Sequence, residues 1–246
     1  MSTIQKIPKV IHYCWFGGQE KPSIVKKCMA SWERYLPDYQ IVEWKEDNIN
    51  LEINQYVKEA YQAGKFAFVS DYVRVHALYH YGGIYLDTDV EIFKSLDPFL
   101  QHDSFWGFEQ ENFIATSTIG AAKGNKLIKL FLDSYEDIHF VNQDGSFNEF
   151  TNVAKITEIL SNKGLVLNGE LQEMNGMATF YPQTYFSPYD YINCRKFITE
   201  DTYAMHLFHK SWLPVTARIK GNMKSLASKI IGGENIAKLR KIATKA

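Results

Sequence analysis

Hydrophobic and polar residues alternate along the first ninety residues in a way that predicts strands and helices in turn. Apolar β-branched and aromatic runs indicate buried strands at residues 9–15, 41–44 and 84–86. Apolar residues at helical spacing indicate helices at residues 22–35, 51–63 and 70–81. The pair Gly82-Gly83 is a helix stop that separates the last helix from the strand after it. This strand–helix–strand order predicts an α/β domain.

The pattern is weaker in the second half of the chain but continues in the same way. Further strands are predicted at residues 105–109, 113–121, 178–181 and 203–206. Further helices are predicted at residues 125–138 and 151–160. Between residues 164 and 205 there is no repeat and no linker, so residues 1–217 are taken as one domain.

The last part of the chain, residues 218–246, has a different charge pattern. It carries eight Lys or Arg residues and one acid, Glu234, a net charge of +7, so the rest of the chain is acidic. Its apolar residues fall on one helical face, which predicts a basic amphipathic helical tail. Such a tail suits an anionic membrane surface. A solvated last helix packed on the domain is the other interpretation.

Composition narrows the function classes. The 246 residues are 46% hydrophobic with a formal net charge of -1, which excludes nucleic-acid binding by overall charge. The three cysteines form no CxxC pair and indicate buried free thiols in a reducing compartment. No leader and no long apolar stretch is visible, so we expect a cytoplasmic protein that is soluble or peripheral on the inner face of the membrane.

The helix predicted at residues 70–81 begins with an acid and a base. Ser70 is expected to cap this helix, which would put Asp71 in its first turn, where a carboxylate is favoured. Arg74 follows three residues later on the same helical face. The two charged side chains therefore point the same way.

Two carboxylates, Asp87 and Asp89, follow the strand predicted at residues 84–86. At positions i and i+2 they can converge on one Mg²⁺ or Mn²⁺ ion and leave coordination sites for a diphosphate. An isolated DxD is usually a polar turn. Here the nearby acid–base pair and the Gly82-Gly83 turn favour a metal site, where a cation and a guanidinium would stabilise a departing diphosphate.

Three separated blocks carry a resemblance to a known family. They are residues 7–18, residues 70–91, and Ala204-Met205-His206 with the Ser-Trp pair at residues 211–212. In these blocks the chain resembles the DXD-containing glycosyltransferases of family 32, with a more distant similarity to the core of the large clostridial glucosylating toxins. The resemblance implies a GT-A, Rossmann-like domain with a mixed central sheet, a nucleotide-sugar donor, Mn²⁺ or Mg²⁺, and retention of anomeric configuration.

The same resemblance implies roles for residues that bind the donor. Trp15 is similar to the aromatic residue that stacks on the donor base. Asp71 and Arg74 resemble the pair that grips the donor sugar and the diphosphate, and Tyr85 resembles a wall of that pocket. Asp87 is similar to the carboxylate that reaches the ribose and the sugar.

The resemblance also implies the metal ligands and a flap. Asp89 resembles the principal metal ligand beside Asp87, and His206 resembles a late ligand that completes the site. The catalytic set is therefore Asp71, Arg74, Asp87 and Asp89.

The flap that closes on the diphosphate is implied at Ser211 and Trp212. Family members often carry a second His after the first, where this chain has Leu207. The choice of metal ligand between His206 and His209 is therefore open.

Other candidate residues have simpler explanations. His76 and His80 have the i, i+4 spacing of some zinc pairs, but a packing role is the better interpretation. His12 is expected to be a hydrogen-bonded core residue, and Trp44 and Trp106 are expected in the core.

No residue stands out as a general base, which agrees with a retaining route in which the departing phosphate helps to accept the proton. Four carboxylates could still lie in the cleft: Glu109, Glu111, Asp144 and Glu149.

The function predicted from these residues is that of a hexosyltransferase. It would move a hexose or N-acetylhexosamine from a nucleotide-diphosphate sugar, with UDP favoured, to a glycan acceptor. A lipid-linked acceptor in bacterial capsular, exopolysaccharide or lipopolysaccharide synthesis is the leading hypothesis. A toxin-like protein glycosyltransferase and a non-catalytic carbohydrate-binding protein on the same fold are the alternatives.

Overall fold

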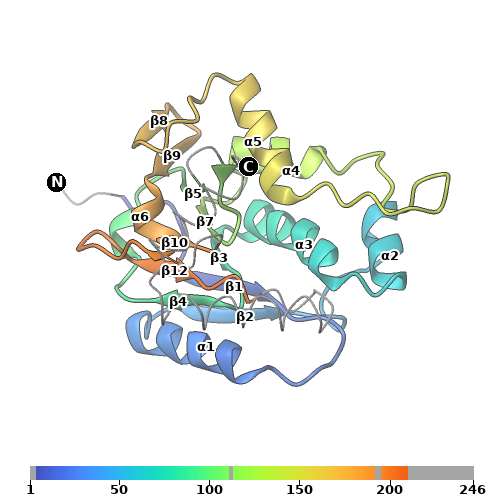
Figure 1. Ribbon diagram of the computed structural model, residues 1–246, viewed down its shortest axis with the longest axis horizontal. Coiled ribbons are helices and arrows are strands. Elements are labelled where there is room, and N and C mark those ends of the chain that lie inside the picture. Colours follow the sequence, from blue (N-terminus) through green and yellow to red (C-terminus); the bar gives the residue numbers. More distant parts are fainter. Residues whose placement is uncertain (1–3, 111–112, 192–194, 210–246) are drawn as a thin grey trace, which may run out of the picture.

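The computed structural model describes residues 4–110, 113–191 and 195–209, and its main sheet has eight strands (Figure 1). These strands are β1 (Val10–Cys14), β2 (Gln40–Trp44), β3 (Gly83–Leu86), β5 (Ser104–Gln110), β6 (Phe113–Ile114), β7 (Thr118–Ala121), β8 (Gln172–Met174) and β9 (Ala178–Tyr181). Two small sheets pair β4 (Val90–Ile92) with β12 (Ala204–His206), and β10 (Tyr189–Asp190) with β11 (Arg195–Lys196). The predicted basic tail, residues 218–246, lies outside the described residues.

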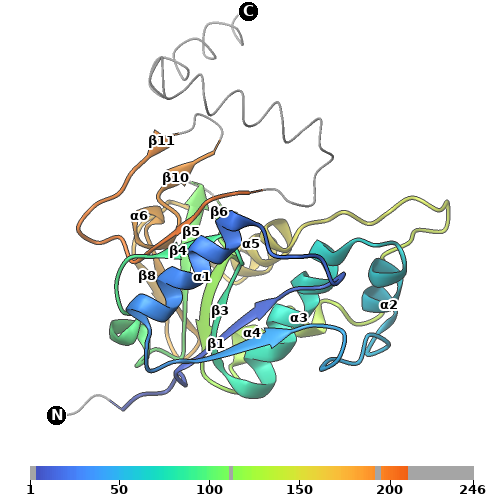
Figure 2. The same ribbon diagram turned by 90° about the horizontal axis from the view of Figure 1, so that it is seen from below.

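Helices cover both faces of the main sheet. They are α1 (Ser23–Tyr35), α2 (Gln55–Gln62), α3 (Phe66–Tyr81), α4 (Lys126–Asp133), α5 (Asn152–Asn162) and α6 (Gln183–Phe186), with a short 3₁₀ helix at Asp97–Phe99. Figure 2 shows α2 and α3 at one end of the domain and the β10–β11 pair at the other. None of the helices in the described ranges is long and apolar enough to cross a membrane.

The main sheet is mixed, and its topology decides where a ligand can bind. Its order is β2-β1-β3-β7-β5-β9-β8, with β6 paired to β5. Strand β1 is parallel to β2 and β3, whereas β7 is antiparallel to both β3 and β5. Strands β1, β3 and β5 therefore run in the same direction and end at one edge. The predicted α/β class with a mixed central sheet is confirmed.

Successive residues of the central strands face two separate cores, as strand geometry requires. Ile11 and Tyr13 of β1 join the cluster that contains Trp32 of α1. Cys14 of β1 and Tyr85 of β3 join the cluster on the α3 side. Burying both faces explains the continuous apolar runs in these strands.

The predictions of buried side chains hold for the residues described. Trp44 and Trp106 are buried, and Cys14 and Cys28 are buried free thiols. His12 is 2% exposed; its Nε2 lies 2.8 Å from the Gly82 carbonyl oxygen, and its Nδ1 accepts from the Trp44 indole. His12 is thus a neutral core residue, and burial lowers its pKa.

The His76 and His80 rings pack against each other, and His76 also packs against neighbouring aromatic rings. The two rings lie 4.3 Å apart, and the His76 ring stacks on Tyr72 and meets the edge of Trp44. The packing interpretation accounts for this pair.

The helix predicted at residues 70–81 begins four residues earlier, so two details of the prediction are wrong. Helix α3 starts at Phe66, because the apolar segment before Ser70 packs into the core, where Val69 is fully buried. Ser70 is therefore no cap, and its hydroxyl donates to the Phe66 carbonyl oxygen. Asp71 lies in the second turn of the helix, not in the first.

Other predicted bounds shift for local reasons. Asn54 caps α2 and Asn125 caps α4, so these helices start at the residue after each cap. Helix α4 ends at Asp133, well before residue 138, and Asp137 takes a positive φ of 59°, which a helix cannot continue. The single strand predicted at residues 113–121 is two strands, β6 and β7.

The predicted stop at Gly82 and Gly83 is confirmed, and it needs glycine. Their φ angles are 69° and 110°, a region that other residues rarely adopt. A Cβ atom on Gly83 would lie 2.6 Å from the Val10 carbonyl oxygen, which is too close. The chain can therefore turn from α3 straight into β3.

Glu59 of α2 holds the loop that follows α4. Its carboxylate accepts from the backbone N–H groups of Phe140 and Val141 at 2.8 and 3.0 Å and contacts His139 Nδ1 at 2.9 Å. Although burial raises the pKa of Glu59, these hydrogen bonds lower it to about 2. A pKa lower in the folded state than in the unfolded chain means that the ionised form stabilises the fold.

We expect Glu59→Gln to lower the free energy of unfolding by about 1–3 kcal/mol at pH 7, because an ionised acceptor is lost. The difference in free energy of unfolding between the wild type and Glu59→Gln should be complete above the unfolded pKa of about 4.3. It should disappear as the pH falls toward 2. Urea unfolding at several pH values measures both effects. Glu52→Gln, at an exposed ion pair with Lys58, is the matched control; an equal loss in both variants would contradict the account.

Candidate functional site

Asp87 follows β3 directly and is fixed on several sides. Its backbone N–H donates to the Ser117 carbonyl oxygen at 2.8 Å, and its own carbonyl accepts from Val90 at 3.0 Å, which closes a tight turn. The buried Tyr85 hydroxyl donates to Asp87 Oδ1 at 3.0 Å. Tyr85 therefore holds the Asp87 carboxylate from the buried side of the strand.

The pairing of β4 with β12 brings His206 to the acidic turn. Val90 of β4 stands opposite His206 of β12 in the antiparallel register. The next residues of the chain then wrap Asp89, since the Leu207 N–H donates to its carbonyl oxygen at 3.0 Å and the His209 N–H donates to its Oδ2 at 2.7 Å. His209 thus contacts Asp89 through its backbone, whereas His206 presents its ring.

Asp87, Asp89 and His206 form a group that could hold a cation. One ligand atom from each lies within 4.8 Å of the others, and the residues that the structure describes hold one such group. His206 Nε2 is 3.4 Å from Asp89 Oδ1, and its Nδ1 is buried without a hydrogen-bond partner among the described residues. Two carboxylates and an imidazole suit Mn²⁺ or Mg²⁺ with phosphate oxygens as further ligands.

The acid and the base of this group shift each other's pKa. Burial alone would raise the pKa of Asp89 and lower that of His206. Their mutual attraction outweighs burial, so the pKa of Asp89 is lowered and the pKa of His206 is raised. In the absence of a cation, the imidazolium form of His206 is the counterion of Asp89.

Arg74 connects α3 to the acidic turn. Its guanidinium lies 2.7 Å from Asp71 Oδ1 and 3.4 Å from Asp87 Oδ1, and it donates to the Thr116 carbonyl oxygen at 2.8 Å. It also lies 4.7 Å from the ring centroid of Tyr85. Arg74 is 5% exposed, so its charge is compensated almost entirely by protein groups.

Asp71 is held in place from α5. The Asn152 side chain donates to the Asp71 carbonyl oxygen at 2.9 Å and accepts from the Tyr135 hydroxyl. Burial raises the pKa of the Asp71 carboxyl, against the opposing charge of Arg74. The sequence did not predict this support, because Tyr135 and Asn152 lie in segments with no recognisable motif.

Of the other residues predicted to bind the donor, Trp15 lies within the described structure. Trp15 follows β1 and Asp87 follows the parallel neighbour β3, so both lie at the same edge of the sheet. The Trp15 indole donates to the Gln19 carbonyl oxygen, and the Lys21 ammonium lies 5.6 Å from its ring. Ser211 and Trp212 lie outside the described residues.

Of the three described carboxylates among those considered as bases, Glu109 is the one that reaches this region. Burial and the Asp87 charge raise the pKa of Glu109, the charges of His206 and Arg74 lower it, and the net result is a pKa of about 7. Asp144 and Glu149 are exposed and bonded elsewhere, to Ser146 and Lys65, and Glu111 lies outside the described residues.

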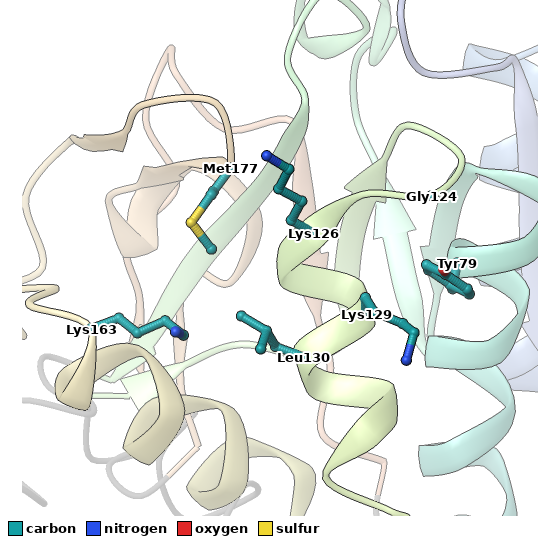
Figure 3. A pocket seen from close by; sticks show the side chains of 7 residues that line it. All are labelled: Tyr79, Gly124, Lys126, Lys129, Leu130, Lys163 and Met177. Atoms are coloured by element: carbon teal, nitrogen blue, oxygen red, sulfur yellow. The ribbon is translucent and has the colours of Figure 1, made fainter.

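A separate hollow of about 510 Å³ lies between the end of α3 and helices α4 and α5 (Figure 3). It is lined by Tyr79, Gly124, Lys126, Lys129, Leu130, Lys163 and Met177. Lys129 is paired with Asp133 and lies over the Tyr79 ring. The lining residues include none of the acidic or imidazole groups described above.

Comparison with known proteins identifies the family of this chain. A family model described as capsular polysaccharide synthesis protein matches residues 2–156. This chain belongs to that family. The capsular polysaccharide synthesis match covers the β1 block and the block that holds the acid–base pair of α3 and the Asp87 turn, which are two of the three blocks that carried the resemblance to DXD-containing glycosyltransferases.

Curated relatives agree with this assignment. The chain is 32% identical over 130 residues to inositol phosphoceramide mannosyltransferase 3 of Schizosaccharomyces pombe, which is 50% of this chain and 35% of that protein. It is 25% identical over 217 residues to an uncharacterized glycosyltransferase of Acanthamoeba polyphaga mimivirus, 85% of this chain and 84% of that one. The predicted relationship to glycosyltransferases is confirmed. The chain spans about a third of the length of the yeast mannosyltransferases it matches.

A solved structure, the PaToxG glycosyltransferase, aligns with a TM-score of 0.49 and 19% identity over 65% of this chain and 71% of that chain.

We expect Arg74→Met to lower the free energy of unfolding by about 3–5 kcal/mol, because it leaves the buried carboxylates of Asp71 and Asp87 without their cation. Urea unfolding measures the change. Arg34→Met, at an exposed position on α1, should stay within about 0.5 kcal/mol of the wild type. Equal stability of the Arg74 variant and the wild type would show that the guanidinium does not hold the site together.

Cation binding to this family member should compete with protons. Because the pKa of His206 is raised and an imidazolium cannot bind a metal ion, Mn²⁺ affinity should fall as the pH drops below that pKa, by roughly tenfold per pH unit. Calorimetry in buffers of different ionisation enthalpy should detect proton release. The dependence should be lost in His206→Gln and kept in His209→Gln; a pH-independent wild-type affinity would contradict the assignment.

Proposed function

We propose that this chain transfers a hexose or N-acetylhexosamine from a nucleotide-diphosphate sugar to a glycan acceptor, with retention of configuration. Mn²⁺ or Mg²⁺ would be held by Asp87, Asp89 and His206. The observation that carries the proposal is the convergence of these three side chains within 4.8 Å, at the strand edge where α/β sheets bind ligands.

The charges around this group fit the departure of a diphosphate. A bound divalent cation would neutralise the negative charge that builds on the diphosphate oxygens as the bond to the sugar breaks. Arg74 adds a fixed positive charge beside Asp87, already oriented by the Asp71 carboxylate and the Thr116 carbonyl. Because this guanidinium is held before the donor arrives, little reorganisation is needed when charge develops.

Other residues of the site would position the donor. Asp71, placed beside Arg74 by α3 and α5, can accept a hydrogen bond from a sugar hydroxyl. Trp15, at the end of the neighbouring strand, can offer a ring face to the base. The sheet edge would then hold the base near β1 and the diphosphate near β3. The flap at Ser211 and Trp212 would close over the diphosphate.

The relatives suggest donors and acceptors to test. Two relatives from Schizosaccharomyces pombe are named as inositol phosphoceramide mannosyltransferases, which adds a mannosyl donor to the UDP-sugars favoured from the sequence. Their names also specify a lipid acceptor, which supports a lipid-linked acceptor here. The family description supports a role in bacterial capsular polysaccharide synthesis. Location at the inner membrane face through the basic tail is part of the same hypothesis.

With Mn²⁺ and the correct nucleotide sugar, the protein should hydrolyse the donor slowly even without an acceptor. Asp89→Ala should reduce this turnover by at least about a hundredfold, since it removes a proposed ligand and the partner of His206. The donor can be chosen by metal-dependent thermal stabilisation with UDP-Glc, UDP-Gal, their N-acetyl forms and GDP-Man.

Asp133→Ala, on the far helix α4, is the control and should keep wild-type turnover. Turnover that persists after chelation of the metal would count against the scheme. Sugar binding that depends on neither nucleotide nor metal would instead support the non-catalytic carbohydrate-binding alternative.

A further inference from the structure

Glu109 is an unusual residue of β5, because it is the extra residue of a β-bulge. Phe108 pairs with Ile114 and Gln110 pairs with Phe113, so two steps along β5 match a single step along β6. A bulge of this kind redirects the side chain of the extra residue and is common next to active sites. The backbone of β5 is therefore shaped specifically at Glu109.

The redirected carboxyl group has no partner among the described residues. It is partly buried there and makes no hydrogen bond or ion pair with any of them. A carboxyl group that is partly withdrawn from water without such a partner loses hydrogen bonds that water would otherwise supply. A ligand hydroxyl that donates to this carboxyl group would replace one of them.

The sheet register places Glu109 at the same edge as the proposed donor site. Gly83 of β3, Ala121 of β7 and Ser104 of β5 form one row across the sheet. Counting forward along the parallel strands β3 and β5, Asp87 stands level with Phe108, so Glu109 lies one residue farther along its strand than Asp87 does. They are separated by the width of β7, roughly 10 Å between β3 and β5.

The segment between β6 and β7 fills the space between these two strands and joins them. The Ala115 N–H donates to the Gly107 carbonyl oxygen of β5, and the Ser117 carbonyl oxygen accepts from Asp87. The Ser117 hydroxyl is buried without a partner among the described residues. This segment thus links the acidic turn to β5 through its backbone.

The order of groups along this edge assigns Glu109 to the acceptor side. Trp15 follows β1 and the acidic turn follows β3, so a donor with its base near β1 and its diphosphate near β3 points its sugar toward β5. Glu109 is not one of the residues whose ligand atoms lie within 4.8 Å of one another in the candidate cation group. Its place on β5, next to β7 and on the far side of it from β3, is the side from which an acceptor would approach a sugar held in this way.

We propose that Glu109 binds the acceptor, by accepting a hydrogen bond from the hydroxyl group that attacks the sugar or from its neighbour. This inference rests on the proposed transferase function. In the transfer, the bond from the anomeric carbon to the phosphate oxygen breaks and a bond to the acceptor oxygen forms. The acceptor proton leaves with a diphosphate oxygen, and Glu109 ends the reaction unchanged.

The test separates acceptor use from donor use in the full chain. With the donor found by thermal stabilisation and octyl glycosides as acceptor probes, Glu109→Gln should lower kcat/KM for the glycoside by about 10- to 100-fold, mainly through KM. Acceptor-independent donor hydrolysis and stabilisation by Mn²⁺ with UDP or GDP should stay within about twofold of wild type. Glu158→Gln, an exposed carboxylate on α5, is the matched control and should change neither activity.

Three results would overturn the inference. One is unchanged glycoside transfer by Glu109→Gln. A second is an equal loss of transfer, donor hydrolysis and nucleotide binding, which would make Glu109 a donor residue. The third is a wild-type chain that hydrolyses the donor but uses none of the glycosides. Absence of metal-dependent hydrolysis by the wild-type chain is a different outcome and would refute the proposed function itself.

Discussion

The short pairing of β4 with β12 is the constraint on which the candidate site depends. Asp87 and Asp89 lie in one turn, but His206 comes from far along the chain and reaches them because it stands opposite Val90 in this pairing. Three-residue strands are weak alone. This pair is stabilised by α1, where the Trp32 indole donates to the Val90 carbonyl oxygen at 2.7 Å. Buried contacts of α1 thus determine where an imidazole lies relative to two carboxylates.

Arg74 plays the corresponding part on the other side of the acidic turn. Its buried guanidinium joins α3, the end of β3 and the segment before β7 through Asp71, Asp87 and Thr116. A buried cation between two carboxylates stabilises the fold only while all partners are present. The same arrangement keeps a positive charge oriented beside the place proposed for the diphosphate. Stability and the proposed chemistry therefore depend on one set of contacts.

The features predicted correctly from the sequence depend on local spacing. The strand at residues 9–15, the Gly82-Gly83 stop and the i, i+3 pair of Asp71 and Arg74 could be predicted because each is encoded within a few residues. Features that depend on distant partners could not. Strand β4 is three residues long and exists only through β12, and the start of α3 at Phe66 was missed because its first turn is fixed by core packing. The bulge at Glu109 is defined only by comparing two strands.

Pulsed electron paramagnetic resonance of the Mn²⁺-loaded protein tests the central claim most directly, because it detects a nitrogen nucleus bound to the ion. The β4–β12 register predicts a ¹⁴N coupling from one imidazole that disappears in His206→Gln and remains in His209→Gln. A coupling that survives the His206 substitution, or that is absent from the wild-type protein, would contradict the account.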